Sequence, residues 1–480
     1  MDKSISFVLD DDLKVVEFDT DAGITPTTTV LNYLRSLPTH KGVKEGCAEG
    51  DCGACTVVVG EPGNIGSIRY KNVDSCLLFL PMIHGKQVIT VENLRQTNGA
   101  LHPVQRAMVE SHGSQCGFCT PGFVMSLFAL YKNTDHPSRE EIDDALTGNL
   151  CRCTGYRPIV EAAAKACVNS GIDQFTATVE RTAELLKSIP RRSIHVQSGS
   201  QHYWRPVSIS EALGLRREHP DALLIAGATD IALRVTKKHE LLKKIIDLSA
   251  VDKLNKISES PASITVGTSV TLSDAMPILK KDFPALHEIL SVFGSQQIRN
   301  VATFGGNLGT ASPIGDTLPV LIAYGGSVIL ESLGGKREVS LDNFFIGYRK
   351  TACQSDEIIT AVVLPKPVNG VRVRSYKVSK RRDLDISTVS AGFRLRLNKE
   401  GMVDSVTLAF GGMAERTRRA STVEKFLVGR DWSREVVEEA AGMIQREFSP
   451  ISDVRASARY RSLAARNLLL KFWDETKGKE

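Results

Sequence analysis

Residues 44–55 read KEGCAEGDCGAC, and one more cysteine follows this stretch after a gap. The four cysteines of this group are Cys47, Cys52, Cys55 and Cys76. The Cys-x4-Cys-x2-Cys spacing with a distant fourth cysteine is the ligand spacing of plant-type [2Fe–2S] clusters. The stretch therefore predicts a small ferredoxin-like unit at the N-terminus.

Glycines lie among these cysteines, at positions where a cluster-binding loop has to bend. Gly46, Gly50 and Gly53 tolerate positive φ and close backbone approach. We expect backbone N–H groups of this loop to point at the sulfurs, where they offset the negative charge of a cluster. A zinc site is the first alternative, but zinc usually takes two Cys-x2-Cys units or histidines. A disulfide framework is the second, and it does not suit a chain without an export signal.

A second group of four cysteines follows in the motifs SQCGFCTPG and GNLCRCTGYRP. Its members are Cys116, Cys119, Cys151 and Cys153. This group predicts a second [2Fe–2S] site, although Cys-x2-Cys with Cys-x-Cys could also hold zinc. We expect the two remaining cysteines, Cys167 and Cys353, to be buried small hydrophobic residues.

The composition is that of a globular protein with several domains. The chain has 480 residues, of which 42% are hydrophobic and 24% charged, and this length suggests about three domains. The net charge of +5 is too small to indicate a nucleic-acid partner. No apolar run approaches the ~18 residues of a membrane span, and the start MDKSISFVLDDD does not resemble an export signal. We therefore expect a cytoplasmic protein without membrane contact.

The first 200 residues divide into three segments. Residues 1–90 alternate strand-like runs (ISFVLD, KVVEFD, CTVVVG, QVITVE) with one helical stretch, VLNYLRSL, which predicts a small α+β domain. Residues 91–167 contain four helical stretches; Pro121 is suited to a first turn, and Ser138 with Glu141 forms a capping box. The four cysteines of this segment fall at helix starts and ends, so that helix N-termini can point at a cluster. Residues 168–200 lose this pattern and are expected to be a linker with one helix over RTAELLKSI.

The rest of the chain divides into two further segments. Residues 201–373 are rich in glycine, and the run VATFGGNLGTASPIGD offers successive backbone N–H groups to a pyrophosphate. The run matches neither a Rossmann nor a P-loop motif and could be a plain turn. Next to two iron–sulfur sites, FAD is the natural cofactor, because it exchanges both single electrons and a hydride. Residues 374–480 pair two strands with three helices, and we expect them to supply packing and oligomer surface.

A basic stretch opens the last segment. Its residues are Arg374, Lys377, Lys380, Arg381 and Arg382. They predict either a solvated loop or a position near an anionic cofactor.

Taken together, six motifs resemble the iron–sulfur and flavin half of the xanthine dehydrogenase family of molybdenum hydroxylases. These motifs are GCAEGDCGAC, QCGFCTPGF, GNLCRCTGYRPI, TFGGNLGTASPIGD, FFIGYRKT and SKRRDLDIS, in that order. The resemblance implies an α+β multidomain fold. Its parts are a β-grasp ferredoxin domain, a four-helix [2Fe–2S] domain, a two-lobed FAD domain of the vanillyl-alcohol-oxidase type and a C-terminal α/β cap. The family also needs a molybdopterin domain, which these 480 residues do not contain. The chain therefore resembles the small subunit of a split bacterial enzyme.

The resemblance also implies cofactor contacts, residue by residue. The segment LIAGATDI would line FAD; it consists of Leu224, Ile225, Ala226, Gly227, Ala228, Thr229, Asp230 and Ile231. The pyrophosphate and ribitol would lie at Thr303, Phe304, Gly305, Gly306, Asn307 and Asp316. Phe293 would lie against the flavin ring, Ile359 and Lys377 at its edge, and Tyr348 where the nicotinamide approaches. Ile225, Ala226 and Ile231 could equally be strand core, and Lys377 could simply be exposed.

The implied reaction moves electrons from a molybdenum centre on a partner chain. They would leave a purine such as hypoxanthine or xanthine and pass through the helical-domain cluster and the ferredoxin-like cluster to FAD, which reduces NAD⁺. The implied assembly is a heterotetramer of two small and two molybdopterin-binding large subunits. We name no catalytic acid or base in this chain. The alternatives are another hydroxylase of the family (for aldehydes or other heterocycles), a stand-alone NADH diaphorase or ferredoxin reductase, and a metal-binding scaffold without enzymatic activity.

Overall fold

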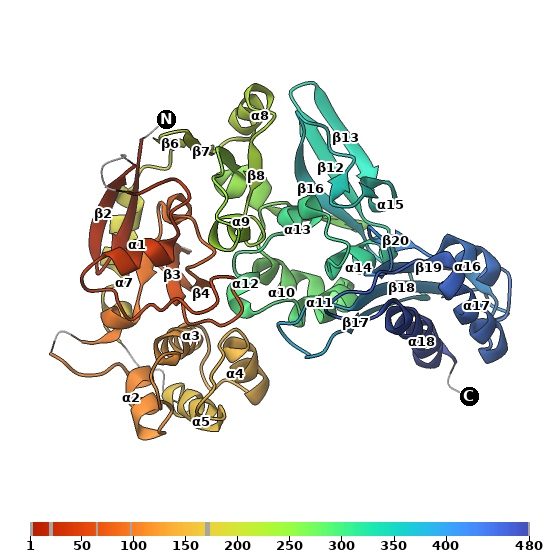
Figure 1. The fold of residues 1–480 in the computed structure, drawn as a ribbon, viewed down its shortest axis with the longest axis horizontal. Helices are drawn as coiled ribbons and strands as arrows, with labels where there is room; N and C mark the ends of the chain where they lie inside the picture. Colours follow the sequence, from red (N-terminus) through yellow and green to blue (C-terminus); the bar gives the residue numbers. More distant parts are fainter. Residues whose placement is uncertain (1–2, 19–22, 64–65, 97, 169–172, 479–480) are drawn as a thin grey trace. The chain divides into compact units, whose positions relative to one another are not determined.

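The computed structural model describes residues 3–18, 23–63, 66–96, 98–168 and 173–478. These residues form two compact units, and Figure 1 labels many of their elements. The first unit contains Met1–Asp252 and Gly294–Ala302, and the second contains Lys253–Phe293 and Thr303–Glu480. In the described part of the chain, no helix is both long enough and apolar enough to cross a membrane.

The first unit begins with a five-stranded sheet of order β2-β1-β5-β3-β4. Its elements are β1 (Ser4–Leu9), β2 (Asp12–Glu17), α1 (Val30–Ser36), β3 (Thr56–Pro62), β4 (Ile68–Asp74), η2 (Leu80–Ile83), β5 (Gln87–Ile89) and η3 (Val91–Leu94). Strands β1 and β5 are parallel, and the other neighbours are antiparallel. This mixed sheet with one helix is the β-grasp arrangement that the motifs predicted.

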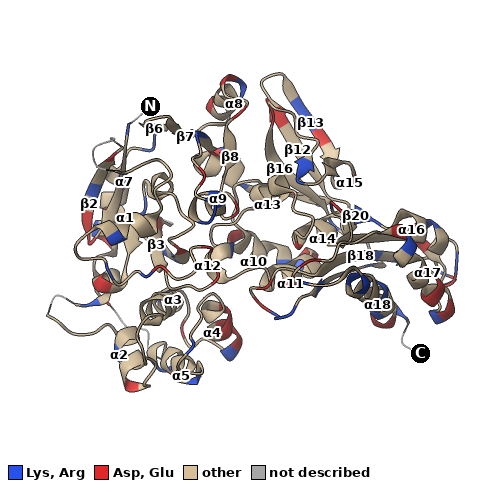
Figure 2. Cartoon of the chain, in the orientation of Figure 1, with Lys and Arg blue, Asp and Glu red and all other residues tan. Residues whose placement is uncertain are grey.

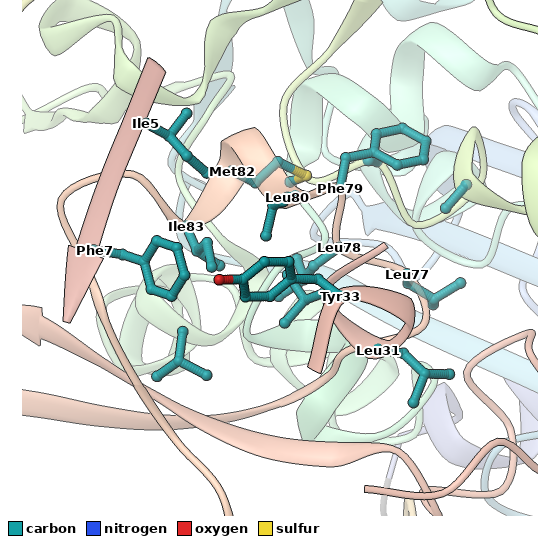
Figure 3. Close-up of a cluster of buried hydrophobic side chains, with 14 of the residues drawn as sticks. Ile5, Phe7, Leu31, Tyr33, Leu77, Leu78, Phe79, Leu80, Met82 and Ile83 are labelled. Atoms are coloured by element: carbon teal, nitrogen blue, oxygen red, sulfur yellow. The ribbon is translucent and has the colours of Figure 1, made fainter. Parts of the chain in front are cut away.

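Strand β1 (SISFVL) packs on both of its faces. On one face, Ile5 and Phe7 pack against α1 and η2, and the rings of Phe7 and Tyr33 meet edge to face at 5.9 Å (Figure 3). On the other face, Val8 packs against Leu186 of α7 (Val179–Ser188). Burial of this kind stabilises the sheet by about 25 cal/mol per Å² of apolar surface removed from water.

Four helices follow the sheet, and the second cysteine group lies at the starts of two of them. They are α2 (Pro103–Glu110), α3 (Thr120–Asn133), α4 (Arg139–Leu146) and α5 (Arg157–Ala166). The predicted capping box is present, since Ser138 Oγ accepts from the Glu141 N–H at 3.2 Å and Glu141 accepts from the Ser138 N–H at 2.7 Å. Pro121 lies in the first turn of α3, as predicted. The acidic residues of α4 are coloured red in Figure 2.

The predicted linker is largely folded where the structure describes it; residues 169–172 lie outside the described part. It contains α6 (Gln174–Ala177), the expected helix α7, and β6 (Ile194–Ser198). Strand β6 opens a second sheet of order β6-β7-β9-β8. The remaining elements here are β7 (Gln201–Arg205), α8 (Ile209–Glu218), β8 (Leu223–Ile225), α9 (Ala232–Thr236), β9 (Lys244–Asp247) and η4 (Leu248–Ala250).

The segment Gly294–Ala302 returns to the first unit late in the sequence and contains α12 (Gln296–Arg299). Arg299 is almost fully buried and pairs with Asp144 of α4. Asn300 donates to the backbone carbonyl of Asn72 in β4 at 2.8 Å. This short segment therefore ties the ferredoxin-like sheet to the helical region.

The second unit contains two large sheets and a two-stranded sheet, β14-β15. The first large sheet has the order β10-β11-β16-β12-β13 and the second the order β17-β18-β19-β20. The elements around the first sheet are η5 (Asp252–Asn255), β10 (Ile257–Glu259), β11 (Ser263–Gly267), α10 (Leu272–Asp282), α11 (Pro284–Ser291), α13 (Phe304–Thr310), α14 (Thr317–Ala323), β12 (Ser327–Ser332), β13 (Gly335–Ser340), α15 (Leu341–Phe344), β14 (Phe345–Gly347), β15 (Lys350–Thr351) and β16 (Ile358–Pro365). The elements around the second sheet are β17 (Val371–Val378), β18 (Val389–Leu397), β19 (Val403–Gly411), β20 (Arg418–Arg419), α16 (Ser421–Leu427), α17 (Arg434–Glu447) and α18 (Ala458–Thr476).

The predicted α+β multidomain fold class is confirmed, with some local differences. Strand β4 was not predicted, because its sequence IRYKNVD mixes charged and apolar residues; its buried Asn72 is satisfied by Asn300. The stretch VRASARYRSLAARNLLLKFW predicts a helix from Val454, but helix α18 begins at Ala458, after the Ser457 cap. The domain boundaries at 90, 167, 200 and 373 remain predictions.

Candidate functional site

The first cysteine group lies on the loop that enters β3 and on the turn that leaves β4. Its sulfurs lie in two pairs. The Cys55 and Cys76 Sγ atoms are 3.3 Å apart and both residues are buried. The Cys47 and Cys52 thiols share a hydrogen bond, and the Cys47 N–H also donates to Cys52 Sγ at 3.3 Å.

Backbone N–H groups point at these sulfurs, as the sequence predicted. The Glu49 and Asp51 N–H groups donate to Cys47 Sγ at 3.4 and 3.3 Å. Together with the Cys52 thiol, which contributes most, they lower the pKa of Cys47 and favour its thiolate form. Gly50 and Gly53 have positive φ, and a Cβ on Gly46 would lie 2.8 Å from Cys52 Sγ. The glycines therefore have the predicted roles.

The second group also forms two pairs, Cys119 with Cys151 and Cys116 with Cys153. Cys119 is the N-cap residue of α3, and the other three lie in the loops before α3 and α5. Burial, followed by the Cys151 thiol, raises the pKa of Cys119 to about 12. Burial also disfavours the Cys151 thiolate, but hydrogen bonds from the Thr154 hydroxyl and N–H outweigh this and lower the pKa of Cys151.

The paired arrangement fits two-iron clusters. Each iron of a [2Fe–2S] cluster takes two cysteine sulfurs, so four pairs provide for two clusters. A structural zinc ion instead needs four ligands that converge on one point. In the described residues, no three or more His, Cys, Asp or Glu side chains are arranged to hold one metal ion. All ten cysteines are free thiols, so the disulfide alternative receives no support.

The two cysteines outside these groups differ from one another. Cys167 is fully buried, as predicted, and burial raises its pKa to about 11. Cys353 was expected to be buried as well, and this expectation was wrong. It is only partly buried and lies near the backbone carbonyls of Gln354 and Glu357.

In the second unit, the predicted pyrophosphate segment begins α13. Thr303 caps this helix, and its Oγ1 accepts from the Gly306 N–H at 3.0 Å. The Gly305 N–H donates to the Thr268 carbonyl at 3.0 Å, and a Cβ on Gly305 would lie 2.4 Å from Thr268 Cβ. Only glycine therefore fits at this position, where the backbone packs closely against Thr268.

Asp316 and Lys377 form a buried ion pair beside this segment. Lys377 Nζ lies 2.9 Å from Asp316 Oδ2, and the two side chains are 5% and 8% exposed. The alternative that Lys377 is simply exposed was therefore wrong. Lys377 also donates to the carbonyl of Val292, the neighbour of Phe293, at 2.9 Å.

Further contacts join most of the remaining predicted residues of the second unit. The Thr317 hydroxyl donates to Asn307, and Thr317 follows Asp316 directly. The Thr268 hydroxyl donates to the Ile359 carbonyl at 2.6 Å. Tyr348 does not join this group: it lies between β14 and β15 and is 63% exposed.

In the first unit, the predicted LIAGATDI segment runs from β8 through a tight turn to α9. Ile225 is buried in the core of this unit, which supports the alternative of strand core for that residue. A Cβ on Gly227 would lie 2.0 Å from the Val301 carbonyl, and Ala228 has φ +59°. The turn is therefore tightly constrained, as expected of a turn that presents its backbone to a ligand.

The basic stretch borders a cavity of about 500 Å³ in the second unit. Lys377, Lys380, Arg381 and Arg382 line it together with Glu288 of α11. Arg374 instead lies near Glu475 at 3.6 Å. Sequence reasoning missed Thr268 and Ser387, whose hydroxyl donates to Asp316. No local motif marks either residue, because each is defined by a partner far away in the sequence.

Comparison with known families identifies three regions of the chain. Residues 90–164 match the [2Fe-2S] binding domain, and residues 196–367 match the FAD binding domain in molybdopterin dehydrogenase. Residues 374–476 match the CO dehydrogenase flavoprotein C-terminal domain. Iron–sulfur and FAD domains are therefore present.

Two solved structures resemble part of the chain. A chain of carbon monoxide dehydrogenase from Hydrogenophaga pseudoflava has a TM-score of 0.54 and 25% identity over 56% of this chain and 94% of its own. A chain of quinoline 2-oxidoreductase from Pseudomonas putida 86 has a TM-score of 0.53 and 25% identity over 57% of this chain and 95% of its own.

Relatives by sequence cover most of the chain. The xanthine dehydrogenase/oxidases of Gallus gallus and Rattus norvegicus are each 33% identical, over 91% and 96% of it. The xanthine dehydrogenase of Drosophila pseudoobscura is 35% identical over 88%. The chain spans 36 to 38% of the length of these relatives. By its motifs, its domains and these relatives, the chain belongs to the xanthine dehydrogenase family of molybdenum hydroxylases.

Proposed function

We propose that this chain is the electron-transfer subunit of a xanthine dehydrogenase. Electrons from a molybdenum centre on a partner chain pass through two [2Fe–2S] clusters to FAD, and NAD⁺ is the final acceptor. The observation that carries the proposal is the arrangement of eight cysteine sulfurs as four pairs within one compact unit. Two one-electron carriers in one unit suit a protein that splits an electron pair and delivers it singly.

The proposed cluster ligands are the predicted ones. Cys47, Cys52, Cys55 and Cys76 hold the ferredoxin-like cluster, with the Cys47/Cys52 and Cys55/Cys76 pairs each on one iron. Cys116, Cys119, Cys151 and Cys153 hold the helical-domain cluster in the same way. The match of residues 90–164 to a [2Fe-2S] binding domain supports the second assignment.

FAD supplies the exchange between single electrons and a hydride. In the second unit, the proposed contacts are Phe293, Thr303–Asn307, Asp316, Ile359 and Lys377. In the first unit, the proposed contacts are Leu224–Ile231. Leu224–Ile231 and Thr303–Asn307 both fall within the match to the FAD binding domain, which supports both assignments. The close packing at Gly305 and the constrained turn at Gly227 hold the two segments in defined conformations. The Asp316–Lys377 ion pair holds both side chains in fixed positions.

We place the nicotinamide of NAD⁺ at Tyr348. Its high exposure leaves the ring accessible to a soluble cofactor. No residue of this chain is proposed as a catalytic acid or base, because hydroxylation would take place on the partner.

The proposed partner is a molybdopterin-binding large subunit, in a cytoplasmic heterotetramer of two small and two large subunits. The matched chain of carbon monoxide dehydrogenase is covered to 94% by this one. An enzyme of similar fold therefore carries this region on a chain of its own, which supports a separate partner subunit. Iron-bound thiolates also suit a reducing compartment.

Cofactor analysis and dye reduction test the proposal. The purified chain should contain about four iron atoms, about four sulfides and one FAD. Electron paramagnetic resonance of the reduced protein should show two cluster signals. NADH should reduce an artificial dye without a partner, whereas xanthine should do so only after the partner is added. Stoichiometric zinc, a single reducible cluster or xanthine hydroxylation by the chain alone would contradict the proposal.

A second candidate is the electron-transfer subunit of a hydroxylase for another substrate. The likeness to carbon monoxide dehydrogenase and quinoline 2-oxidoreductase favours it. Assays of the reconstituted complex with xanthine, an aldehyde, quinoline and carbon monoxide distinguish the two candidates. Turnover with xanthine far above that with the others is the result expected from our proposal.

A further inference from the structure

The two cysteine groups contact each other directly through the backbone. The Leu150 N–H, one residue before Cys151, donates to the carbonyl of Cys52 at 3.0 Å. The neighbouring Asn149 donates through Nδ2 to the carbonyl of Gly53 at 3.1 Å. A hydrogen-bonded link therefore joins a proposed ligand of the ferredoxin-like cluster to the residue next to a proposed ligand of the helical-domain cluster.

Glycines make this contact possible. Gly53 has φ +66°, and a Cβ there would lie 2.3 Å from the Gly148 carbonyl oxygen and 2.4 Å from Asn149 Nδ2. On the other side, a Cβ on Gly122 would lie 2.1 Å from the Gly53 carbonyl oxygen. A side chain at Gly53 would force the two loops apart, and one at Gly122 would force α3 away from the Gly53 loop.

A buried network fixes the orientation of Asn149. The residue is 2% exposed, and its Oδ1 accepts from Ser126 Oγ at 2.6 Å and from Gln297 Nε2 at 2.9 Å. Gln297 itself is 1% exposed. With Oδ1 held by two donors, Nδ2 must face the cluster loop, where Thr56 Oγ1 also lies within 3.3 Å.

We propose that electrons pass between the two clusters through the Leu150–Cys52 hydrogen bond. Asn149 is then the positioning residue that keeps this hydrogen bond formed. Electron tunnelling decays less steeply through covalent and hydrogen bonds than across a gap, so a direct backbone link raises the electronic coupling between the clusters. Each step moves one electron and no proton. The helical-domain cluster is oxidised and the ferredoxin-like cluster is reduced. The inference rests on the proposed function, because it needs both clusters.

Asn149→Ala tests the inference in the full chain loaded with clusters and FAD. NADH reduces the flavin, and rapid freezing followed by electron paramagnetic resonance reports each cluster separately. We expect the ferredoxin-like cluster to be reduced at the wild-type rate and the helical-domain cluster about tenfold more slowly, a size typical of changes next to metal ligands. The magnetic interaction between the two reduced clusters should also weaken. Hydrogen–deuterium exchange at Leu150 should accelerate about fivefold, the effect of losing a ~1 kcal/mol restraint.

Asn133→Ala is the matched control. Asn133 also donates through Nδ2 from a helix to the ferredoxin-like sheet, to the Tyr70 carbonyl at 2.8 Å. It should leave the reduction rates and the magnetic interaction unchanged. If Asn149→Ala does not fold, Gln297→Ala removes one donor to Asn149 and leaves the Leu150 and Cys52 residues themselves unchanged. It should slow reduction of the helical-domain cluster in the same direction.

Two outcomes have different meanings. If wild-type protein lacks two cluster signals or is not reduced by NADH, the proposed function itself fails. If wild-type protein shows both signals but Asn149→Ala leaves inter-cluster reduction and magnetic interaction unchanged while exchange at Leu150 accelerates, the electron route is wrong and the contact is structural.

Discussion

The two cysteine sites each consist of four cysteines in two pairs, but their surroundings differ. In the ferredoxin-like loop, Cys55 and Cys76 are 2% and 1% exposed, and backbone N–H groups surround Cys47. In the helical region, Cys116 and Cys153 are exposed, and the Thr154 side-chain hydroxyl donates to Cys151 Sγ. The first site is the more buried, and its sulfurs accept hydrogen bonds from the backbone. The second site is more accessible, and one of its sulfurs also accepts a hydrogen bond from a side chain.

This difference matters because solvent exposure and hydrogen bonds to sulfur both tune cluster potentials. A sheltered site exchanges electrons best with groups inside its own chain. An accessible site is suited to a partner protein. The contrast therefore agrees with the proposed order of electron flow, in which the helical-domain cluster receives electrons first.

The largest expected effect comes from replacing a ligand at one site only. Cys116→Ser or Cys151→Ser should abolish the helical-domain signal in electron paramagnetic resonance and leave the ferredoxin-like signal intact, because the two sets share no sulfur. Cys55→Ser should do the reverse. Loss of both signals from either change would mean that the sites are not separate. Coupled xanthine-to-NAD⁺ activity should disappear in Cys119→Ser while NADH–dye activity remains.

A buried ionic group supports the helical region alone. Asp173 accepts from His102 at 3.2 Å and from Lys132 at 2.9 Å, with Asp173 and His102 almost fully buried. Asp173→Asn should lower the free energy of unfolding of this region by about 3 kcal/mol at pH 7. Asp143→Ala, which breaks an exposed pair with Arg139, should cost at most about 0.5 kcal/mol. Chemical denaturation followed by circular dichroism measures both.

The same carboxylate predicts a pH dependence. Burial raises the pKa of Asp173, but hydrogen bonds from His102 and Lys132 outweigh it and hold this pKa well below the usual 3.8. A carboxyl with a lowered pKa stabilises the fold above its unfolded pKa and loses this effect as the pH falls through the folded pKa. The stability difference between wild type and Asp173→Asn should therefore be constant from pH 7 to 5 and shrink below about pH 4. A difference that grows on acidification would contradict the assignment.

A smaller effect is expected on the reduction potential of the helical-domain cluster, to which a side-chain hydroxyl contributes. Thr154→Val removes the hydroxyl that lies 3.2 Å from Cys151 Sγ. One hydrogen bond of about 0.5–1.5 kcal/mol corresponds to a shift of roughly 20–60 mV in a one-electron potential, towards more negative values. A redox titration should show this shift for the helical-domain cluster alone. Thr147→Val, which loses only a bond to the Asp143 carbonyl, should leave both potentials unchanged.

The smallest expected effect is at Cys167. Because this residue is fully buried and belongs to neither group, Cys167→Ala should cost about 1 kcal/mol of stability. Both cluster signals should persist. A bleached cluster would mean that the ligands were grouped wrongly.

The sequence predicted correctly those features that depend on residues close together in the chain. The cysteine spacings, the Ser138 capping box and Pro121 at the start of α3 are all features of short stretches. Features fixed by distant partners were not predictable. Strand β4 buries Asn72 against a residue from Gly294–Ala302, and Lys377 is buried because Asp316 lies opposite. Neither pairing leaves a periodic trace in the sequence.

Cys353 shows the same limit in a different way. A cysteine without a metal motif is most often buried, so the expectation was reasonable. Its exposure depends on the turn after β15, which packs only partly. The placement of the nicotinamide at Tyr348 remains a proposal for a related reason, because contacts within the chain do not reveal the role of so exposed a side chain.

The late return of Gly294–Ala302 to the first unit has a consequence for dissecting this protein. A fragment that ends at Asp252 would contain both cysteine groups but not Gln297, Arg299 or Asn300. Asp144, Asn72 and the amide of Asn149 would then lose partners that only a distant stretch supplies. Truncation at one point therefore cannot yield an intact iron–sulfur module. Expressing this module alone requires residues 294–302 to be grafted back, either as an added peptide or through a circularly permuted gene.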